Sequence, residues 1–188
     1  MNYNNTAAGA DSNEAQSVLD YFKHITTFVF DVDGVLTDGT VLLLENGLQA
    51  RTMHVKDGLA LQMALKNNYH VVVISGAYSD PVLKRLQYLG IKDIFLATKD
   101  KLQLLEKWRT ENGIDWQQML YMGDDLPDVP VLKAVGLAAC PADAVGEVKK
   151  VSQYISPITG GKGCVRDVIE KVLKLAGRWH YETEIVSK

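Results

Sequence analysis

The sequence predicts an α/β fold with three layers, in which helices cover both faces of a parallel β-sheet and a β-hairpin projects after the first strand. Two observations support this prediction. Short apolar runs alternate with segments of helical spacing along most of the 188 residues, a pattern typical of parallel strands joined by helices. In addition, Asn46-Gly47 stands between two β-prone runs, and Asn-Gly is a strong hairpin signal.

Five strands are predicted from short apolar runs; a polar residue or a glycine follows the first four, and the fifth is weaker. These runs cover residues 27–30, 70–74, 94–97, 119–122 and 136–139. The hairpin is predicted from the two β-prone runs at residues 41–44 and 49–54.

Helices are predicted before, between and after these strands, where apolar residues recur at helical spacing. They cover residues 14–23, 57–67, 81–89, 99–111, 127–134 and 163–175. The helix at 81–89 begins with Pro81 and is followed by Gly90, residues that suit a first helical turn and a helix end.

Length and composition fit one globular domain that can bury a core. We expect residues 1–23 to form a flexible extension with a short helix, residues 24–177 to form the domain and residues 178–188 to form a tail. The net charge is −3 and the basic residues are scattered, so nucleic acid is not an expected partner.

The termini and the cysteines indicate a cytoplasmic protein. The polar N-terminus lacks the regions of a signal peptide. No apolar run approaches the ~18 residues that span a bilayer. Cys140 and Cys164 belong to no CxxC pair and no His cluster, which favours reduced, buried thiols.

Acidic residues gather at the ends of the predicted strands. Asp31 and Asp33 follow the first strand, and Asp124, Asp125 and Asp128 follow the fourth. In an open parallel sheet these ends meet at one crevice. Crowded carboxylates repel one another and are costly to bury unless a cation compensates them. Because these segments offer hard oxygens and no His or Cys, the pattern favours Mg²⁺.

Other polar residues near these ends suit phosphoryl transfer. A carboxylate that attacks phosphorus approaches an anionic group, and a divalent ion and a nearby cation reduce the repulsion. Lys101 can supply that cation, and Ser75 can donate to a phosphoryl oxygen. Backbone N–H groups around Gly34 and Gly76 can do the same. Asp33 can protonate the leaving alkoxide and later deprotonate the attacking water.

These residues also have structural interpretations, which the sequence leaves open. Asp33 could form a turn and Ser75 could cap one. Lys99 rivals Lys101, because both lie at a predicted helix start. Asp125 and Asp128 could simply be acidic residues at a helix start, which the helix dipole favours. Asp38 could simply be a loop residue.

The segment Asp31-Val32-Asp33-Gly34-Val35-Leu36-Thr37 resembles the first motif, DxDGxxT, of haloacid dehalogenase superfamily phosphatases. Ser75 resembles their second motif, Lys101 their third, and Gly123-Asp124-Asp125 with Asp128 their fourth, GDDxxD. The resemblance implies a Rossmann-like fold, a phospho-aspartate on Asp31 and acid/base catalysis by Asp33. It also implies Mg²⁺ held by the Asp31 carboxylate, the Asp33 backbone carbonyl and Asp124, with Asp125 and Asp128 in support.

The spacing of the motifs leaves no room for the cap domain that many superfamily members carry. Residues 38–75 hold only the hairpin and one helix, and residues 75–101 hold only a helix and a strand. We therefore expect a capless enzyme whose site is open unless another subunit covers it.

The hairpin, the phrase His54-Val55-Lys56-Asp57-Gly58 and the stretch 160–166 resemble the 3-deoxy-D-manno-octulosonate (KDO) 8-phosphate phosphatases. That resemblance implies hydrolysis of a sugar-acid phosphate in lipopolysaccharide synthesis. It also implies a homotetramer in which hairpins meet and a neighbouring subunit completes each site. The residues it places at the substrate are Lys56 and Asp57, with Gly58 beside them, in addition to Gly34 and Gly76 at the phosphoryl group.

Several alternatives remain. Lys56 could be solvated, Asp57 could cap the next helix, and Arg166 could be a subunit contact, a substrate residue or a surface position. Relatives commonly carry Arg where this chain has Ala77, and Arg85 lies further along. The alternative substrates are therefore a nine-carbon keto-deoxy sugar acid 9-phosphate or another small sugar phosphate. A receiver domain that uses a phospho-aspartate as a signal is a further alternative.

Overall fold

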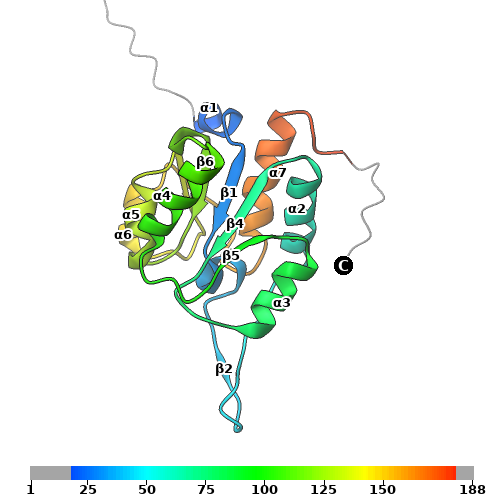
Figure 1. The fold of residues 1–188 in the computed structure, drawn as a ribbon, viewed down its shortest axis with the longest axis vertical. Helices are drawn as coiled ribbons and strands as arrows, with labels where there is room; N and C mark the ends of the chain where they lie inside the picture. Colours follow the sequence, from blue (N-terminus) through cyan, green and yellow to red (C-terminus); the bar gives the residue numbers. More distant parts are fainter. Residues whose placement is uncertain (1–17, 181–188) are drawn as a thin grey trace, which may run out of the picture.

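Six parallel strands form the centre of the structure, a computed structural model that describes residues 18–180 (Figure 1). Their spatial order is β5-β4-β1-β6-β7-β8, so the first strand lies in the middle of the sheet. Because neighbouring strands pair in parallel, all of them end at the same edge. The strands are β1 (Thr27–Phe30), β4 (His70–Ile74), β5 (Asp93–Phe95), β6 (Met119–Met122), β7 (Leu137–Cys140) and β8 (Tyr154–Ile155).

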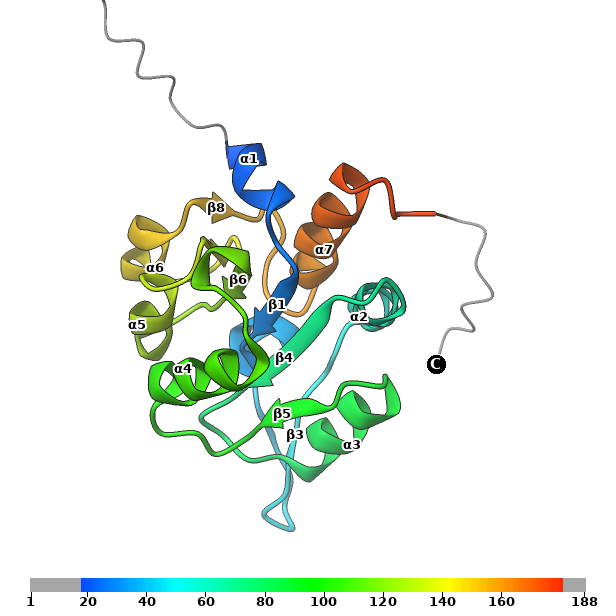
Figure 2. The ribbon, with the colours of Figure 1, turned by 45° about the horizontal axis from the view of Figure 1, so that its top comes forward.

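Helices cover both faces of this sheet (Figure 2). One face carries α1 (Val18–Lys23), α2 (Val55–Lys66), α3 (Asp80–Tyr88) and α7 (Cys164–Leu175). The other carries α4 (Lys101–Asn112), α5 (Val129–Leu132) and α6 (Gly146–Val151). The predicted three-layer α/β architecture is therefore confirmed.

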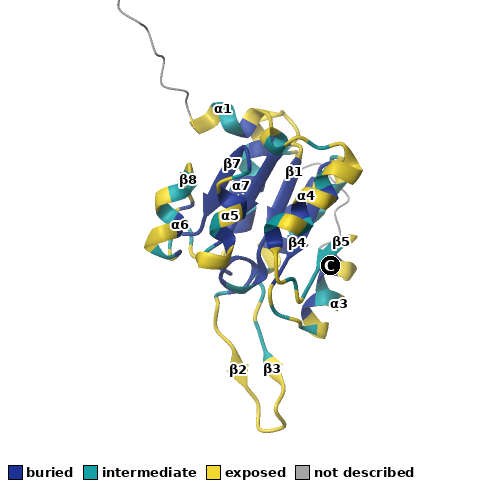
Figure 3. Ribbon diagram, turned by 60° about the vertical axis from the view of Figure 1, so that its left-hand side comes forward, coloured by how far each residue is buried: buried dark blue, intermediate teal, exposed yellow. Residues whose placement is uncertain are grey.

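The side chains of each strand alternate between two apolar layers, because successive residues of a strand point to opposite faces. In β1, Phe28 and Phe30 join the layer beneath α2 and α7, whereas Val29 joins the layer beneath α4 and α5. In β6, Leu120 and Tyr121 divide in the same way. Burial on both faces explains why these strands appear in the sequence as continuous apolar runs (Figure 3).

A β-hairpin projects from the edge at which the strands end (Figures 1 and 3). It consists of β2 (Leu42–Leu43) and β3 (Gln49–Ala50), which pair antiparallel as predicted. Gly47 has φ +79°, a backbone conformation that glycine adopts without strain. Leu42, Leu43 and Leu48 are 64%, 73% and 63% exposed, so the hairpin presents an apolar surface.

The connections between strands are short, as the motif spacing predicts. Only the helical turn over Val32–Leu36, the hairpin and α2 lie between β1 and β4, and only α3 and β5 lie between β4 and α4. Within residues 18–180 there is no cap domain, and no helix is long and apolar enough to cross a bilayer. Both cysteines are unpaired and buried, as expected, and burial raises the pKa of each thiol.

Three parts of the predicted element list need correction or lie outside the structure. The helix expected over 127–134 is a 3₁₀ turn, η3 (Leu126–Asp128), followed by the single turn of α5. The prediction missed α6 and β8, which are too short for a clear periodic pattern. The helix expected from residue 14 is described only from Val18, because residues 14–17 lie outside the described part.

Candidate active site

Asp31 stands at the carboxyl end of the central strand. Its N–H donates to the Met122 carbonyl at 3.0 Å, which extends the pairing of β1 with β6 by one residue. The chain then turns through η1 (Val32–Leu36), where the Thr37 N–H donates to the Val32 carbonyl. Asp31 is only 8% exposed, and its Oδ1 accepts from the Val32 N–H at 2.7 Å.

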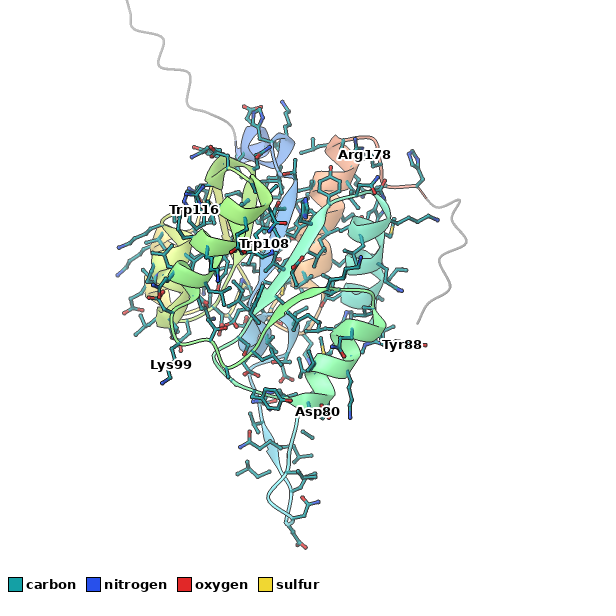
Figure 4. The ribbon with its side chains drawn as sticks, viewed as in Figure 1. Asp80, Tyr88, Lys99, Trp108, Trp116 and Arg178 are labelled. Atoms are coloured by element: carbon teal, nitrogen blue, oxygen red, sulfur yellow. The ribbon has the colours of Figure 1, made fainter. Side chains whose placement is uncertain are left out.

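Lys101 lies between two buried carboxylates. Its Nζ is 3.0 Å from Asp31 Oδ2 and 2.7 Å from Asp128 Oδ1. Burial lowers the pKa of Lys101, but the two carboxylates outweigh this effect and raise the pKa above its usual value. Lys99, the rival candidate, is exposed and points away from the sheet (Figure 4).

Asp128 organises the segment that carries the fourth motif. Its Oδ1 accepts from Lys101 and from the Tyr121 hydroxyl, which lies 2.5 Å away. Its Oδ2 accepts from the N–H groups of Asp124 at 3.0 Å and Asp125 at 3.3 Å. Asp128 is 1% exposed, and these four donors occupy its lone pairs. Asp128 is therefore better placed to hold Lys101 and the Asp124 backbone in position than to ligate a metal directly.

Three carboxylates form a cluster in which Asp31 and Asp124 could hold a cation. One oxygen from each of Asp31, Asp124 and Asp128 lies within 4.8 Å of the others. Gly34 makes this approach possible, because a Cβ at that position would lie 2.0 Å from Asp124 Oδ2. The structure therefore brings together the two side chains that the sequence places at the metal, Asp31 and Asp124.

The carboxylate cluster holds more negative charge than the nearby lysine balances. Burial raises the pKa of Asp31 to about 7; Asp128 adds to the shift and Lys101 opposes it. Burial also raises the pKa of Asp124 to about 7, with further contributions from Asp31 and Asp128. Lys101 alone thus leaves the cluster short of positive charge. A divalent cation with hard oxygen ligands fits this set of donors.

Ser75 and Gly76 directly follow β4, the neighbour of β1 in the sheet. Ser75 is 2% exposed, and its Oγ accepts from the Ala77 N–H at 3.1 Å. That contact leaves the hydroxyl proton available to a ligand oxygen. Gly76 and Lys101 line the same pocket of about 370 Å³.

Asp33 forms a contact that the sequence did not predict. Arg51, which follows β3 in the hairpin, donates from Nε to Asp33 Oδ1 at 2.6 Å. The two residues are 18 positions apart, and no local pattern in the sequence links them. The Asp33 side chain stays 34% exposed, whereas that of Arg51 is 8% exposed.

The predicted substrate residues at the start of α2 differ in exposure and in neighbours. Lys56 is exposed and lines a separate pocket with Lys162 and Arg166. Asp57 is 1% exposed and accepts from the Arg166 N–H at 2.7 Å, so it ties α2 to the first turn of α7 rather than capping its own helix. Burial raises the pKa of Asp57. Gly58 is buried beneath Arg85 and Leu89. The role of Lys56, Asp57 and Gly58 in binding substrate stays a prediction.

The remaining singled-out residues have clear structural roles. Asp125 is exposed and caps η3 by accepting from the Leu126 N–H at 2.8 Å. Asp38 accepts from Thr40, a hydrogen bond that lowers the pKa of Asp38. The Arg166 guanidinium lies over the Trp179 ring at 5.3 Å, so Trp179 of the predicted tail packs beside α7.

The glycine-rich stretch before α7 packs directly against the loop that follows Asp31. A Cβ on Gly160 would lie 2.0 Å from the Gly34 carbonyl oxygen. Gly161 has φ +63° and would place a Cβ 2.5 Å from the Asp38 nitrogen. These close backbone contacts explain why this stretch needs glycine.

Known proteins resemble this chain in sequence. A family model described as haloacid dehalogenase-like hydrolase matches residues 86–167. The KDO 8-phosphate phosphatase of Haemophilus influenzae is 34% identical over 163 residues, which cover 87% of this chain and 89% of that protein. The corresponding phosphatase of Salmonella typhi is 33% identical over 161 residues, 86% of each chain.

Solved structures show the same likeness. The KDO 8-phosphate phosphatase of Moraxella catarrhalis, in complex with magnesium, phosphate and KDO, superposes with a TM-score of 0.81 at 35% identity. The match covers 84% of this chain and 91% of that one. The Yersinia pestis enzyme gives a TM-score of 0.83 at 29% identity over 86% of this chain and 87% of that one. The chain therefore belongs to the haloacid dehalogenase-like hydrolases, as a phosphoric monoester hydrolase resembling the KDO 8-phosphate phosphatases.

Proposed function

We propose that this protein is a Mg²⁺-dependent phosphatase that hydrolyses KDO 8-phosphate to KDO and inorganic phosphate through a phospho-aspartate on Asp31. The observation that carries the proposal is the buried Asp31 carboxylate, held by Lys101 at 3.0 Å and clustered with Asp124. The sequence relatives with this activity and the Moraxella catarrhalis complex with magnesium, phosphate and KDO support the choice of ion and substrate.

Asp31 and Asp124, with the backbone carbonyl of Asp33, would hold the magnesium ion. Their hard oxygens and the excess of negative charge in the cluster fit such an ion. Bound there, Mg²⁺ would neutralise charge on the phosphoryl group as the carboxylate approaches it.

The chain's own residues would carry out two displacements. In the first, an Asp31 oxygen bonds to phosphorus, the bond from phosphorus to the sugar oxygen breaks, and Asp33 gives a proton to that oxygen. In the second, Asp33 takes a proton from water as the water oxygen bonds to phosphorus. The bond from phosphorus to Asp31 then breaks and restores the carboxylate. Lys101 and the Ser75 hydroxyl stabilise the phosphoryl oxygens in both steps.

The test is a comparison of kcat/KM across phosphate esters, with phosphate release as the readout. The panel includes KDO 8-phosphate, a nine-carbon keto-deoxy sugar acid 9-phosphate and sugar phosphates without a carboxylate. We expect the eight-carbon acid to be the best substrate and Asp31→Asn to be inactive while folded. Equal kcat/KM across the panel would contradict the substrate, and an active Asp31→Asn protein would contradict the mechanism.

Ala77 favours the second candidate, a different sugar-acid phosphate. Its backbone lies beside Ser75, but its methyl group cannot pair with a carboxylate as the arginine of many relatives could. A higher kcat/KM for the nine-carbon ester would select this candidate.

We also propose a cytoplasmic homotetramer. The exposed leucines of the hairpin, Leu42, Leu43 and Leu48, support the assembly, because apolar patches of this kind commonly become interfaces. The mass in solution tests this, and a monomer at micromolar concentration would contradict it.

A further inference from the structure

Arg51 joins the hairpin to the loop that carries the proposed acid/base. Its Nε donates to Asp33 Oδ1 at 2.6 Å, and its side chain is 8% exposed. Among the described residues, Arg51 is the only side chain found bonded to the Asp33 carboxylate. The second oxygen of Asp33 therefore remains available on a side chain that is 34% exposed.

Arg51, which binds that carboxylate, also lines a pocket. The pocket has a volume of about 820 Å³ and lies between the hairpin and the start of α3. Tyr78, Asp80 and Arg85 contribute to the opposite wall, and Asp80 marks that wall in Figure 4. The pocket is large enough for a sugar acid, and through Arg51 it adjoins the group that would protonate the leaving oxygen.

We propose that Arg51 is a positioning residue that fixes the Asp33 carboxylate, so that its free oxygen faces the leaving group of a phosphate ester lodged in this pocket. The inference rests on the proposed function, in which Asp33 transfers the proton. A guanidinium suits this task because its planar fork restricts the orientation of a carboxylate that it binds. The hairpin would thereby contribute to catalysis within its own subunit.

A purely structural role makes different predictions. If the ion pair only holds the hairpin against the rest of the domain, its loss would lower stability or weaken substrate binding. The rates on the two kinds of ester would then fall to the same extent. A positioning role affects only the steps that move a proton, and its loss has no further effect once Asp33 is removed.

The experiment compares Arg51→Gln and Arg51→Lys with the unaltered protein on two esters in the presence of Mg²⁺. p-Nitrophenyl phosphate has a leaving group that needs no proton, whereas the alkyl ester KDO 8-phosphate releases an alkoxide that does. For Arg51→Gln we expect the first release of nitrophenolate, measured by stopped flow, to stay within about threefold of the unaltered rate. We expect kcat for the alkyl ester to fall about 10- to 100-fold with KM little changed. Arg51→Lys should recover part of the loss.

A double-mutant cycle and a matched control complete the test. Asp33→Asn and Asp33→Asn with Arg51→Gln should have the same kcat. Arg109→Gln removes another arginine–carboxylate pair, the one between Arg109 and Glu106 on α4, close to Trp116 (Figure 4). It should leave the rates on both esters unchanged. The proposal is overturned by an equal loss on both esters, by a raised KM at constant kcat, by additive effects in the cycle, or by no effect. An active Asp31→Asn protein, measured in parallel, would instead overturn the proposed function.

Discussion

The buried carboxylate of Asp128 offers a sharp test of how the polar centre of the site is held. It is 1% exposed and has two acceptor oxygens, each with two donors. Asp128→Asn keeps the shape but replaces one oxygen with an NH₂ group. In one orientation that NH₂ faces the N–H groups of Asp124 and Asp125; in the other it faces Lys101 and the Tyr121 hydroxyl. Either way, donors meet donors.

The cost follows from the number of broken contacts. An orphaned buried donor costs about 1–3 kcal/mol, and breaking a buried ion pair costs about 3–5 kcal/mol. Because these effects overlap at one side chain, we expect a net loss of about 3–5 kcal/mol. For a domain of this size, that loss corresponds to roughly a 10 °C lower Tm.

Urea unfolding followed by tryptophan fluorescence measures this loss, because Trp108 is buried against the sheet. Asp125→Asn is the matched control. Asp125 is exposed and caps η3, and asparagine keeps a capping oxygen, so we expect a change within about 0.5 kcal/mol. A loss below about 1 kcal/mol for Asp128→Asn would refute the idea that these four contacts hold the segment.

Three further predictions concern the loop, the metal and the thiols. Gly34→Ala should abolish activity and lower stability by more than ~2 kcal/mol in urea unfolding, because its Cβ would meet Asp124 Oδ2 at 2.0 Å. Gly47→Ala, at a similar φ of +79° with nothing within 4 Å, should cost only about 1 kcal/mol; equal losses would contradict the steric argument. EDTA should abolish phosphate release and excess Mg²⁺ should restore it, whereas full activity after exhaustive chelation would contradict the metal site. Cys140 and Cys164 should resist a thiol reagent in the native protein and both react after denaturation; rapid native labelling would show that the core opens readily.

The sequence predicted the parts of the site that follow from strand order. The strands β1 and β6 are buried on both faces, so each appears as a short apolar run that ends one or two residues before an aspartate. Parallel pairing then brings Asp31 and Asp124 to one edge without any knowledge of side-chain geometry. Between Lys99 and Lys101, the family resemblance favoured Lys101, and the structure places Lys101 beside Asp31.

Contacts between distant segments could not be predicted in this way. Asp57 meets the N-terminus of α7 across 109 residues, so a local pattern gave it only a helix-capping or substrate role. Arg51 reaches Asp33 because the hairpin folds back on its own base. The glycines at 160 and 161 were recognised by resemblance alone, and their physical reason is close backbone packing visible only in three dimensions.

The central claim is that the Asp31 carboxylate receives the phosphoryl group. The most direct measurement is mass spectrometry of the protein after rapid acid quenching during turnover of its phosphate ester in Mg²⁺. The account predicts that one phosphoryl group is added to the peptide containing Asp31 and is lost as turnover ends, and that Asp31→Asn shows no such addition. Turnover at the full rate without a phosphorylated Asp31 peptide, or with the phosphoryl group on another residue, would contradict it.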